Sequence, residues 1–112
     1  MRFAYWLDEA ERIRGFEFSG HAGFGEDGQD IVCAGVSALS IAAANGLEYF
    51  LNVPPLAKDG EGFLTCRIEL ASLEELDNAQ WILRTLLLGV ESIQDAYGKE
   101  YVMIEQRRWT PC

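Results

Sequence analysis

Basic residues are scarce in this 112-residue chain, which carries nine Lys and Arg against eighteen Asp and Glu, for a formal net charge of −9 at pH 7. A surface of that charge repels the nucleic-acid backbone unless its cations gather on one face. The arginines form only two small clusters, Arg12 with Arg14 and Arg107 with Arg108. We therefore expect no direct contact with nucleic acid.

Long hydrophobic runs are also missing. Uninterrupted apolar runs such as LLLGV at 86–90 fall far short of the ~20 residues that cross a bilayer. The first residues, MRFAYWLDEAER, lack the basic start and the apolar core of an export signal, and Asp8 brings a negative charge early. We expect no membrane span and a cytoplasmic location.

Cysteine is limited to three residues, an odd number that disfavours a disulfide framework in a reducing compartment. Each thiol is therefore interpreted separately. Cys66 lies in an alternating segment whose apolar side also holds Leu64, Ile68 and Leu70, so we predict a core thiol. Cys112 is an exposed terminal thiol to which we assign no function.

Histidine occurs once, as His21. One His and one neighbouring Cys, without CxxC or HxxxH spacing, cannot complete an all-protein zinc site. We therefore expect no metal and no other cofactor.

The remaining composition, 49% hydrophobic and 12% aromatic, is sufficient for one core, and we expect a single domain over residues 1–112. Alternating apolar residues predict strands, and apolar residues at steps of three and four predict helices. The predicted strands are 3–7, about 16–18, 61–70 and 101–106, and the predicted helices are 31–50 and 73–97. The order ββαβαβ predicts an α+β fold in which two helices pack on one face of a small mixed four-stranded sheet.

The predicted second helix begins with Ser72 and Glu75, which are spaced as a capping box. It carries more apolar residues than one face against one sheet needs. The surplus residues are Trp81, Ile82, Leu87 and Leu88. They indicate either a thick core or a self-association surface.

The stretch GHAGFGEDGQDIVC at 20–33 contains the lone histidine and the first cysteine. Asp30 is the predicted N-cap of the first helix, with Asp27 as the alternative. Cys33 is then the third helical residue, where the free N–H groups of a helix start stabilise a thiolate. It lies on the flank of the buried stripe, with Ser37 one turn later.

His21 can act as the base for a Cys33 nucleophile, because imidazole exchanges protons near neutral pH. Asp30 either orients His21 or only caps the helix, and N–H groups around Cys33 are candidate oxyanion donors. The alternative interpretation is a loop histidine and a core thiol that lie near each other by chance. The residues alone leave this choice open.

Together these motifs resemble the ribosomal-processing cysteine proteases of bacteria, the Prp family. The matching segments are GHAG at 20–23, DIVCA at 30–34, VSAL at 36–39, NGLE at 45–48, GFLTCRI at 62–68 and LLLGVESI at 86–93. The resemblance extends over nearly the whole chain. The combination of GHAG with DIVCA is more specific than a lone histidine and a lone cysteine. One departure is Gly35, where relatives often have alanine, which lowers the helix propensity by up to ~1 kcal/mol.

The resemblance implies a cytoplasmic cysteine endopeptidase that removes a short N-terminal extension from a protein of the large ribosomal subunit. It implies a catalytic dyad of His21 and Cys33, with Asp30 and Ser37 supporting the site and Gly20 helping to shape it. The competing function is a ribosome-associated binding or assembly factor without chemistry.

The resemblance also implies a homodimer, which agrees with the surplus apolar residues of the second helix. The extension removed by relatives ends in aromatic residues, which implies a hydrophobic cleft near the loop. Residues 22–29 would move to admit it, and we expect Gly23, Gly25 and Gly28 to make this loop mobile because glycine has the widest backbone freedom.

Overall fold

The structure is a computed structural model that describes residues 1–23, 25 and 30–110. Its elements are β1 (Arg2–Leu7), β2 (Ile13–Ser19), α1 (Ile31–Phe50), β3 (Leu56–Gly60), β4 (Phe63–Arg67), α2 (Leu73–Tyr97) and β5 (Met103–Arg108). The strands form one sheet in the order β3-β4-β2-β1-β5. The β1–β5 pair is parallel and the other pairs are antiparallel, so the sheet is mixed.

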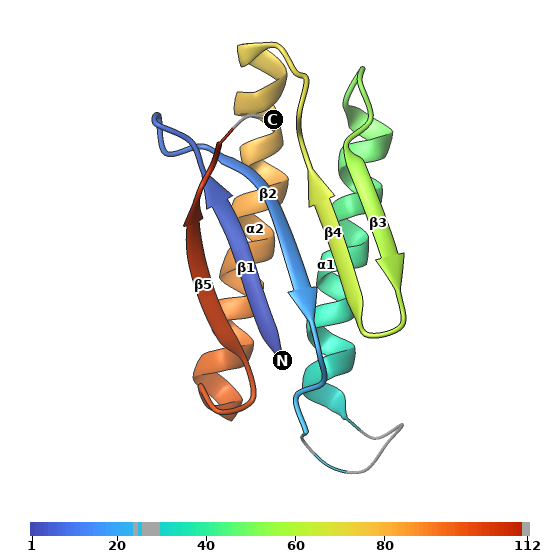
Figure 1. The fold of residues 1–112 in the computed structure, drawn as a ribbon, viewed down its shortest axis with the longest axis vertical. Coiled ribbons are helices and arrows are strands. Elements are labelled where there is room, and N and C mark those ends of the chain that lie inside the picture. The colour runs from blue at the N-terminus through green and yellow to red at the C-terminus, as the bar shows by residue number, and fades with distance from the viewer. Residues whose placement is uncertain (24, 26–29, 111–112) are drawn as a thin grey trace.

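Both helices lie against the same face of the sheet (Figure 1). The predicted α+β class and the two-helix layer are therefore confirmed, and the side chains between the layers form the core, including Phe3, Phe16, Val36, Leu83 and Val90. Phe16 and Phe3 stack with ring centroids 6.1 Å apart, on the paired strands β1 and β2.

The number of strands is a correction, because the sheet has five strands and four were predicted. The additional strand is β3, which pairs antiparallel with β4 at the edge of the sheet. All five of its residues are exposed, so its sequence LAKDG carries no alternation of buried and exposed positions. The observed element order is ββαββαβ.

Helix α1 begins at its predicted position. Asp30 is the N-cap, and its side chain accepts a hydrogen bond from the Cys33 N–H. By length and composition alone α1 could also cross a membrane, with a mean hydropathy of 1.5, but its buried residues pack in the core. These include Val32, Val36 and Leu47.

Helix α2 also has its predicted bounds, but only half of the capping box forms. The Ser72 hydroxyl accepts the Glu75 N–H at 3.1 Å. The Glu75 carboxylate instead accepts the Asn52 N–H at 2.6 Å, which joins the end of α1 to the start of α2. Gly98, at φ 117°, ends the helix.

Gly35 allows the two helices to approach closely. A Cβ at Gly35 would lie 3.1 Å from Cδ1 of Ile93, and a Cβ at Gly89 would lie 2.8 Å from Cδ1 of Leu39. The departure at Gly35 therefore has a packing role, because it leaves room for the Ile93 side chain from α2.

The sheet face away from the helices is covered by stacked arginine and tryptophan side chains. The Arg67 guanidinium lies 4.7 Å from the Trp109 ring and 5.3 Å from the Trp6 ring. Arg107 lies 5.6 Å from Trp6 and donates to the Glu17 carboxylate at 2.6 Å. The guanidinium groups of Arg67 and Arg107 therefore already contact neighbouring side chains within the fold.

Candidate active site

His21 lies just beyond the end of β2, where Gly20 at φ 82° turns the chain. The Gly20 N–H donates to the Gly62 carbonyl oxygen at 2.9 Å, so this turn is attached to the connection between β3 and β4. The His21 carbonyl oxygen accepts a hydrogen bond from the Met1 nitrogen at 3.0 Å. Backbone contacts from two directions therefore place His21, while its side chain remains exposed.

Cys33 lies in the first turn of α1 and is half-buried. Its Sγ is 3.8 Å from Nδ1 of His21, within the range of a hydrogen bond to sulfur. The structure thus brings together the two residues predicted as a nucleophile and base. A thiol and an imidazole at this distance are placed to exchange a proton.

Asp30 uses both carboxylate oxygens on backbone groups. Oδ1 accepts the Cys33 N–H at 2.9 Å, and Oδ2 accepts the Gly23 N–H at 3.1 Å. Among the described residues no bond joins Asp30 to His21. Asp30 therefore caps the helix and attaches Gly23 to it, whereas the alternative of orienting His21 is not seen. The other N-cap candidate, Asp27, lies outside the described residues.

The backbone N–H groups expected to be free around Cys33 are bonded in this state. The Cys33 N–H is held by the Asp30 carboxylate, and the Ala34 N–H donates to the Asp30 carbonyl oxygen at 3.0 Å. Because one N–H cannot bind two oxygens at full strength, an oxyanion at Cys33 would compete with Asp30 for this donor.

The remaining predicted site residues are Ser37 on α1 and the glycines of the segment after His21. Ser37 is half-buried one turn after Cys33, and its hydroxyl has no hydrogen bond within the described part of the chain. Gly23 and Gly25 have φ values of 72° and 90°, a backbone region that favours glycine. Gly28 lies outside the described residues, and the mobility of the loop stays a prediction.

Gly62 is a site residue that sequence reasoning missed. A Cβ at Gly62 would lie 3.5 Å from Nε2 and 3.9 Å from Cε1 of His21, so any side chain at this position would touch the imidazole. The signal was the DGEG segment at 59–62, a turn-forming composition between two apolar segments. The last two residues of this segment, 61 and 62, are instead part of the predicted strand 61–70.

Cys66 is separate from this site. It is 1% exposed on β4, and burial raises the pKa of its thiol to about 12. The prediction of a core thiol is confirmed. The predicted buried face ends with Ile68, however, because β4 ends at Arg67 and Leu70 is 72% exposed.

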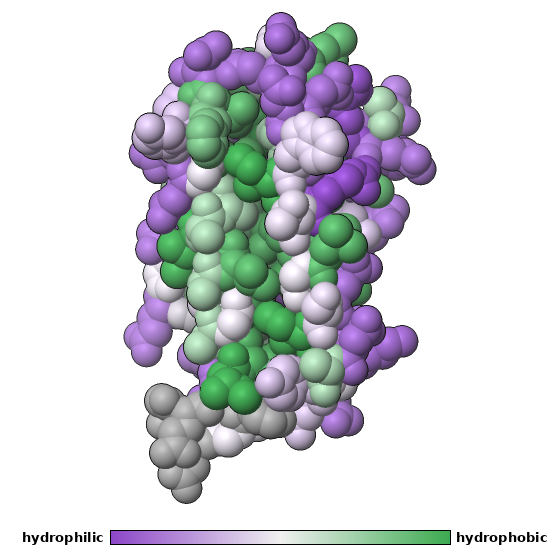
Figure 2. All heavy atoms as spheres, turned by 180° about the vertical axis from the view of Figure 1, so that it is seen from behind, coloured by the Kyte–Doolittle hydropathy of each residue, from purple (hydrophilic) through white to green (hydrophobic). Residues whose placement is uncertain are grey.

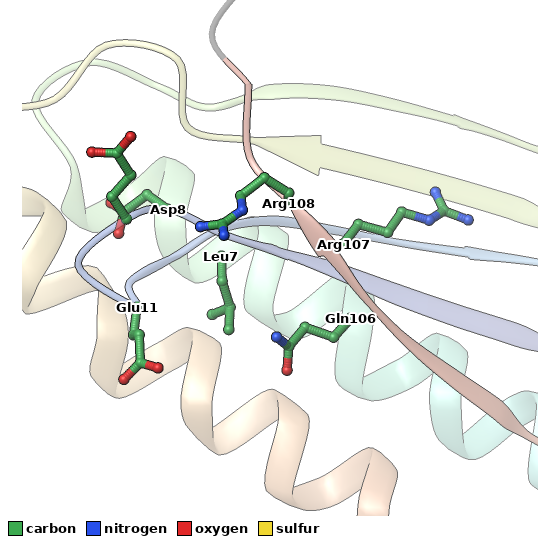
Figure 3. Close-up of a pocket in the computed structure, with 7 residues that line it drawn as sticks. Leu7, Asp8, Glu11, Gln106, Arg107 and Arg108 are labelled. Carbon is green, nitrogen blue, oxygen red and sulfur yellow. The ribbon is translucent and has the colours of Figure 1, made fainter.

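A hollow of about 260 Å³ lies at the β1–β2 turn, at the opposite end of β1 from the His21 and Cys33 pair (Figure 3). Arg108 extends toward this turn and Arg107 points away from it. In the described residues no group of three or more His, Cys, Asp or Glu side chains could hold a metal ion.

Among known families, the model described as cysteine protease Prp matches this chain over residues 2–102. The ribosomal processing cysteine protease Prp of Bacillus subtilis is 35% identical over 88 residues, covering 76% of this chain and 79% of that protein. The Staphylococcus aureus protein of the same name is 34% identical over 95 residues, covering 83% and 87%.

Solved structures give the same result. The S. aureus protease with a covalently linked product peptide matches with a TM-score of 0.81 and 26% identity, over 95% of this chain and 98% of that chain. The structure of SMU.848 from Streptococcus mutans matches with a TM-score of 0.75 and 25% identity, over 96% and 94%. The chain therefore belongs to the Prp family of cysteine proteases.

Proposed function

We propose that this protein is a cysteine endopeptidase that removes a short N-terminal extension from a large-subunit ribosomal protein in the cytoplasm. The observation that carries the proposal is the 3.8 Å separation of Cys33 Sγ and His21 Nδ1 at the start of α1. Membership of a peptidase family favours this function over a binding factor without chemistry. A relative crystallised with a substrate peptide supports a peptide ligand.

The dyad performs the reaction in two halves. His21 takes the proton of the Cys33 thiol, and Sγ attacks the carbonyl carbon of the scissile bond. As the tetrahedral intermediate collapses, His21 gives that proton to the departing amine and a thioester remains on Cys33. Water, deprotonated by His21, then attacks the thioester and releases the carboxylate product and the free thiol.

The oxyanion formed in each half needs N–H donors. The Cys33 N–H is the nearest candidate, and it becomes available when Oδ1 of Asp30 moves away from it. Asp30 is therefore proposed to support the site by holding the helix start and Gly23 in the free enzyme. Ser37, one turn further along α1, is proposed as a second supporting residue.

Two exposed apolar side chains next to site residues in the sequence are proposed to receive the aromatic end of the extension. Ile31, two residues before Cys33, is 55% exposed, and Phe63, which follows Gly62, is 40% exposed. The Phe63 ring lies over Gly60, where a Cβ would collide with it. The paired residues Gly60 and Phe63 thus place the ring at the β3–β4 turn.

The protein is further proposed to act as a homodimer through its helix face. Hydrophobic side chains gather along this face (Figure 2). Phe50 is 71% exposed, Trp81 is 80% exposed and Leu88 is 65% exposed. A groove of about 360 Å³ between α1 and α2 is lined by apolar residues that include Leu39, Phe50 and Trp81. A second copy would cover this surface.

The function is tested with a peptide that spans the junction between the extension and the mature ribosomal protein. Mass spectrometry of the products is expected to show one cleavage by the unmodified protein and none by Cys33→Ala. His21→Ala is expected to be slower by about 10²–10⁴-fold, the usual contribution of a general base. Unimpaired cleavage by Cys33→Ala would end the proposal.

A further inference from the structure

We infer that Gly62, in the turn between β3 and β4, is a positioning residue that sets the orientation of the His21 imidazole toward Cys33. The inference rests on the proposed function of His21 as the base. It adds a residue that lies 41 positions beyond His21 in the sequence and on a different strand connection.

The first observation is what lies near each ring nitrogen. Nδ1 is 3.8 Å from Cys33 Sγ. Nε2 and the adjoining Cε1 lie 3.5 Å and 3.9 Å from the point where a Gly62 Cβ would stand. One ring nitrogen is thus near the nucleophile, and the other is near a backbone position that has no side chain.

The second observation is that no carboxylate among the described residues fixes the orientation of the His21 ring. A catalytic histidine needs a group that fixes its orientation, and in many sites this is a carboxylate. Here both Asp30 oxygens are used on the N–H groups of Cys33 and Gly23. Within the described residues no side chain bonds the second nitrogen of His21, and the backbone position near that nitrogen is Gly62.

The third observation is that Gly62 is fixed relative to the His21 backbone. Its carbonyl oxygen accepts the Gly20 N–H at 2.9 Å. Both glycines have positive φ, 77° at Gly62 and 82° at Gly20, a conformation that other residues adopt with strain. The pairing of Ser19 with Phe63 continues this attachment into the sheet. The ring and its supporting surface therefore belong to one connected unit.

The space behind the ring is limited. A methyl group at position 62 would already be at van der Waals distance from Nε2. A larger side chain there would have to share the volume that the imidazole occupies, and a displaced ring would carry Nδ1 away from Sγ. A displacement near 1 Å can cost about 10²-fold in rate.

The test compares Gly62→Leu with Gly98→Leu, which places the same side chain at another positive-φ glycine, φ 117°, at the end of α2. Two quantities are measured at a temperature below both unfolding transitions: the pH profile of Cys33 alkylation and the kcat and KM for the extension peptide. Gly62→Leu is expected to lower kcat by at least about tenfold at unchanged KM and to change the alkylation profile. Gly98→Leu is expected to match the unmodified protein in both.

Gly62→Ala covers the case in which Gly62→Leu does not fold. Its methyl group would touch the ring at van der Waals distance, and alanine is strained at φ 77°, so we expect a folded protein in which the turn and the ring shift slightly and kcat falls severalfold at unchanged KM. Normal kcat and a normal alkylation profile in the largest folded Gly62 variant would overturn the inference.

His21→Ala separates this failure from failure of the proposed function. If His21→Ala changes the alkylation profile of Cys33 and the Gly62 variants do not, only the positioning role is wrong. If His21→Ala itself leaves the profile unchanged, the dyad is wrong, and the role of Gly62 falls with it.

Discussion

The Asp30 carboxylate binds the backbone of Cys33, since its Oδ1 accepts the Cys33 N–H at 2.9 Å. Its second oxygen accepts the Gly23 N–H, so one side chain joins the helix start to the segment that follows His21. Asp30 thus makes two separate contacts, one that caps α1 and one that attaches Gly23 to it. Different substitutions of Asp30 remove one contact or both.

Asp30→Ser is expected to keep the cap and lose the contact with Gly23, whereas Asp30→Ala loses both. Loss of an N-cap costs about 1 kcal/mol, so Asp30→Ala is expected to lower the free energy of unfolding by that amount and Asp30→Ser by clearly less. Urea unfolding followed by circular dichroism measures both. Ser72→Ala is the matched control, because it removes the cap of α2 away from the site and is expected to leave peptide cleavage unchanged. Equal stability of Asp30→Ala and the unmodified protein would contradict the capping role.

Cys66 predicts a loss of stability at alkaline pH. Its pKa is about 12 in the folded protein against an ordinary value of 9.0, so between these values the unfolded chain binds fewer protons than the native state. Stability is then fully present below pH 9 and falls as pH rises toward 12, by up to ~1.4 kcal/mol per unit. Urea midpoints from pH 8 to 11 measure this decline, and Cys66→Ala is expected to flatten it. An equally steep decline in Cys66→Ala would assign the effect to other groups.

Trp81 predicts the behaviour of the proposed dimer. Because 80% of this side chain is exposed on α2, Trp81→Glu is expected to leave the fold of one copy intact while placing a charge in the interface. Sedimentation velocity at micromolar concentration is expected to show a monomer for Trp81→Glu and a dimer for the unmodified protein. Leu56→Lys on β3, where the side chain is 62% exposed, serves as the control on another surface. A dimer that persists in Trp81→Glu places the interface elsewhere.

Phe63 is expected to act on substrate affinity and Gly62, its neighbour, on the chemical step. Phe63→Ala removes the aromatic contact proposed for the extension and is expected to raise KM by about tenfold with kcat nearly unchanged, because less apolar area is buried when the peptide binds. Steady-state kinetics on the extension peptide separates the two constants. Leu70→Ala, 72% exposed beyond the end of β4, is expected to change neither. A fall in kcat without a change in KM would make Phe63 part of the support for His21.

Local signals in the sequence were sufficient for both helices. Each helix begins where the sequence predicts, directly after Asp30 or Ser72. These N-caps are predictable because an N-cap depends on the few residues around it. Glu75 shows the limit of such signals. It has the capping-box position, yet its carboxylate bonds Asn52, whose proximity depends on how the chain returns after α1.

The candidate site was only partly predictable for the same reason. Cys33 and His21 are only twelve positions apart, at the start of a helix and just after the end of a strand. Their proximity can therefore be expected from the local sequence. Gly62 reaches His21 only because β4 pairs with β2, a long-range contact that the composition of the turn does not encode. β3 was missed because its residues face solvent on the sheet edge and leave no apolar pattern.

That exposed strand has a consequence for how the protein behaves at high concentration. An outer strand offers unpaired backbone groups to which another chain can bind, and charged side chains oppose such pairing. β3 presents Lys58 and Asp59 at the border of the sheet beyond β4, and it is only five residues long. These features oppose aggregation by strand addition, so exchanging both charges for valine is expected to make the protein prone to fibril-like assembly.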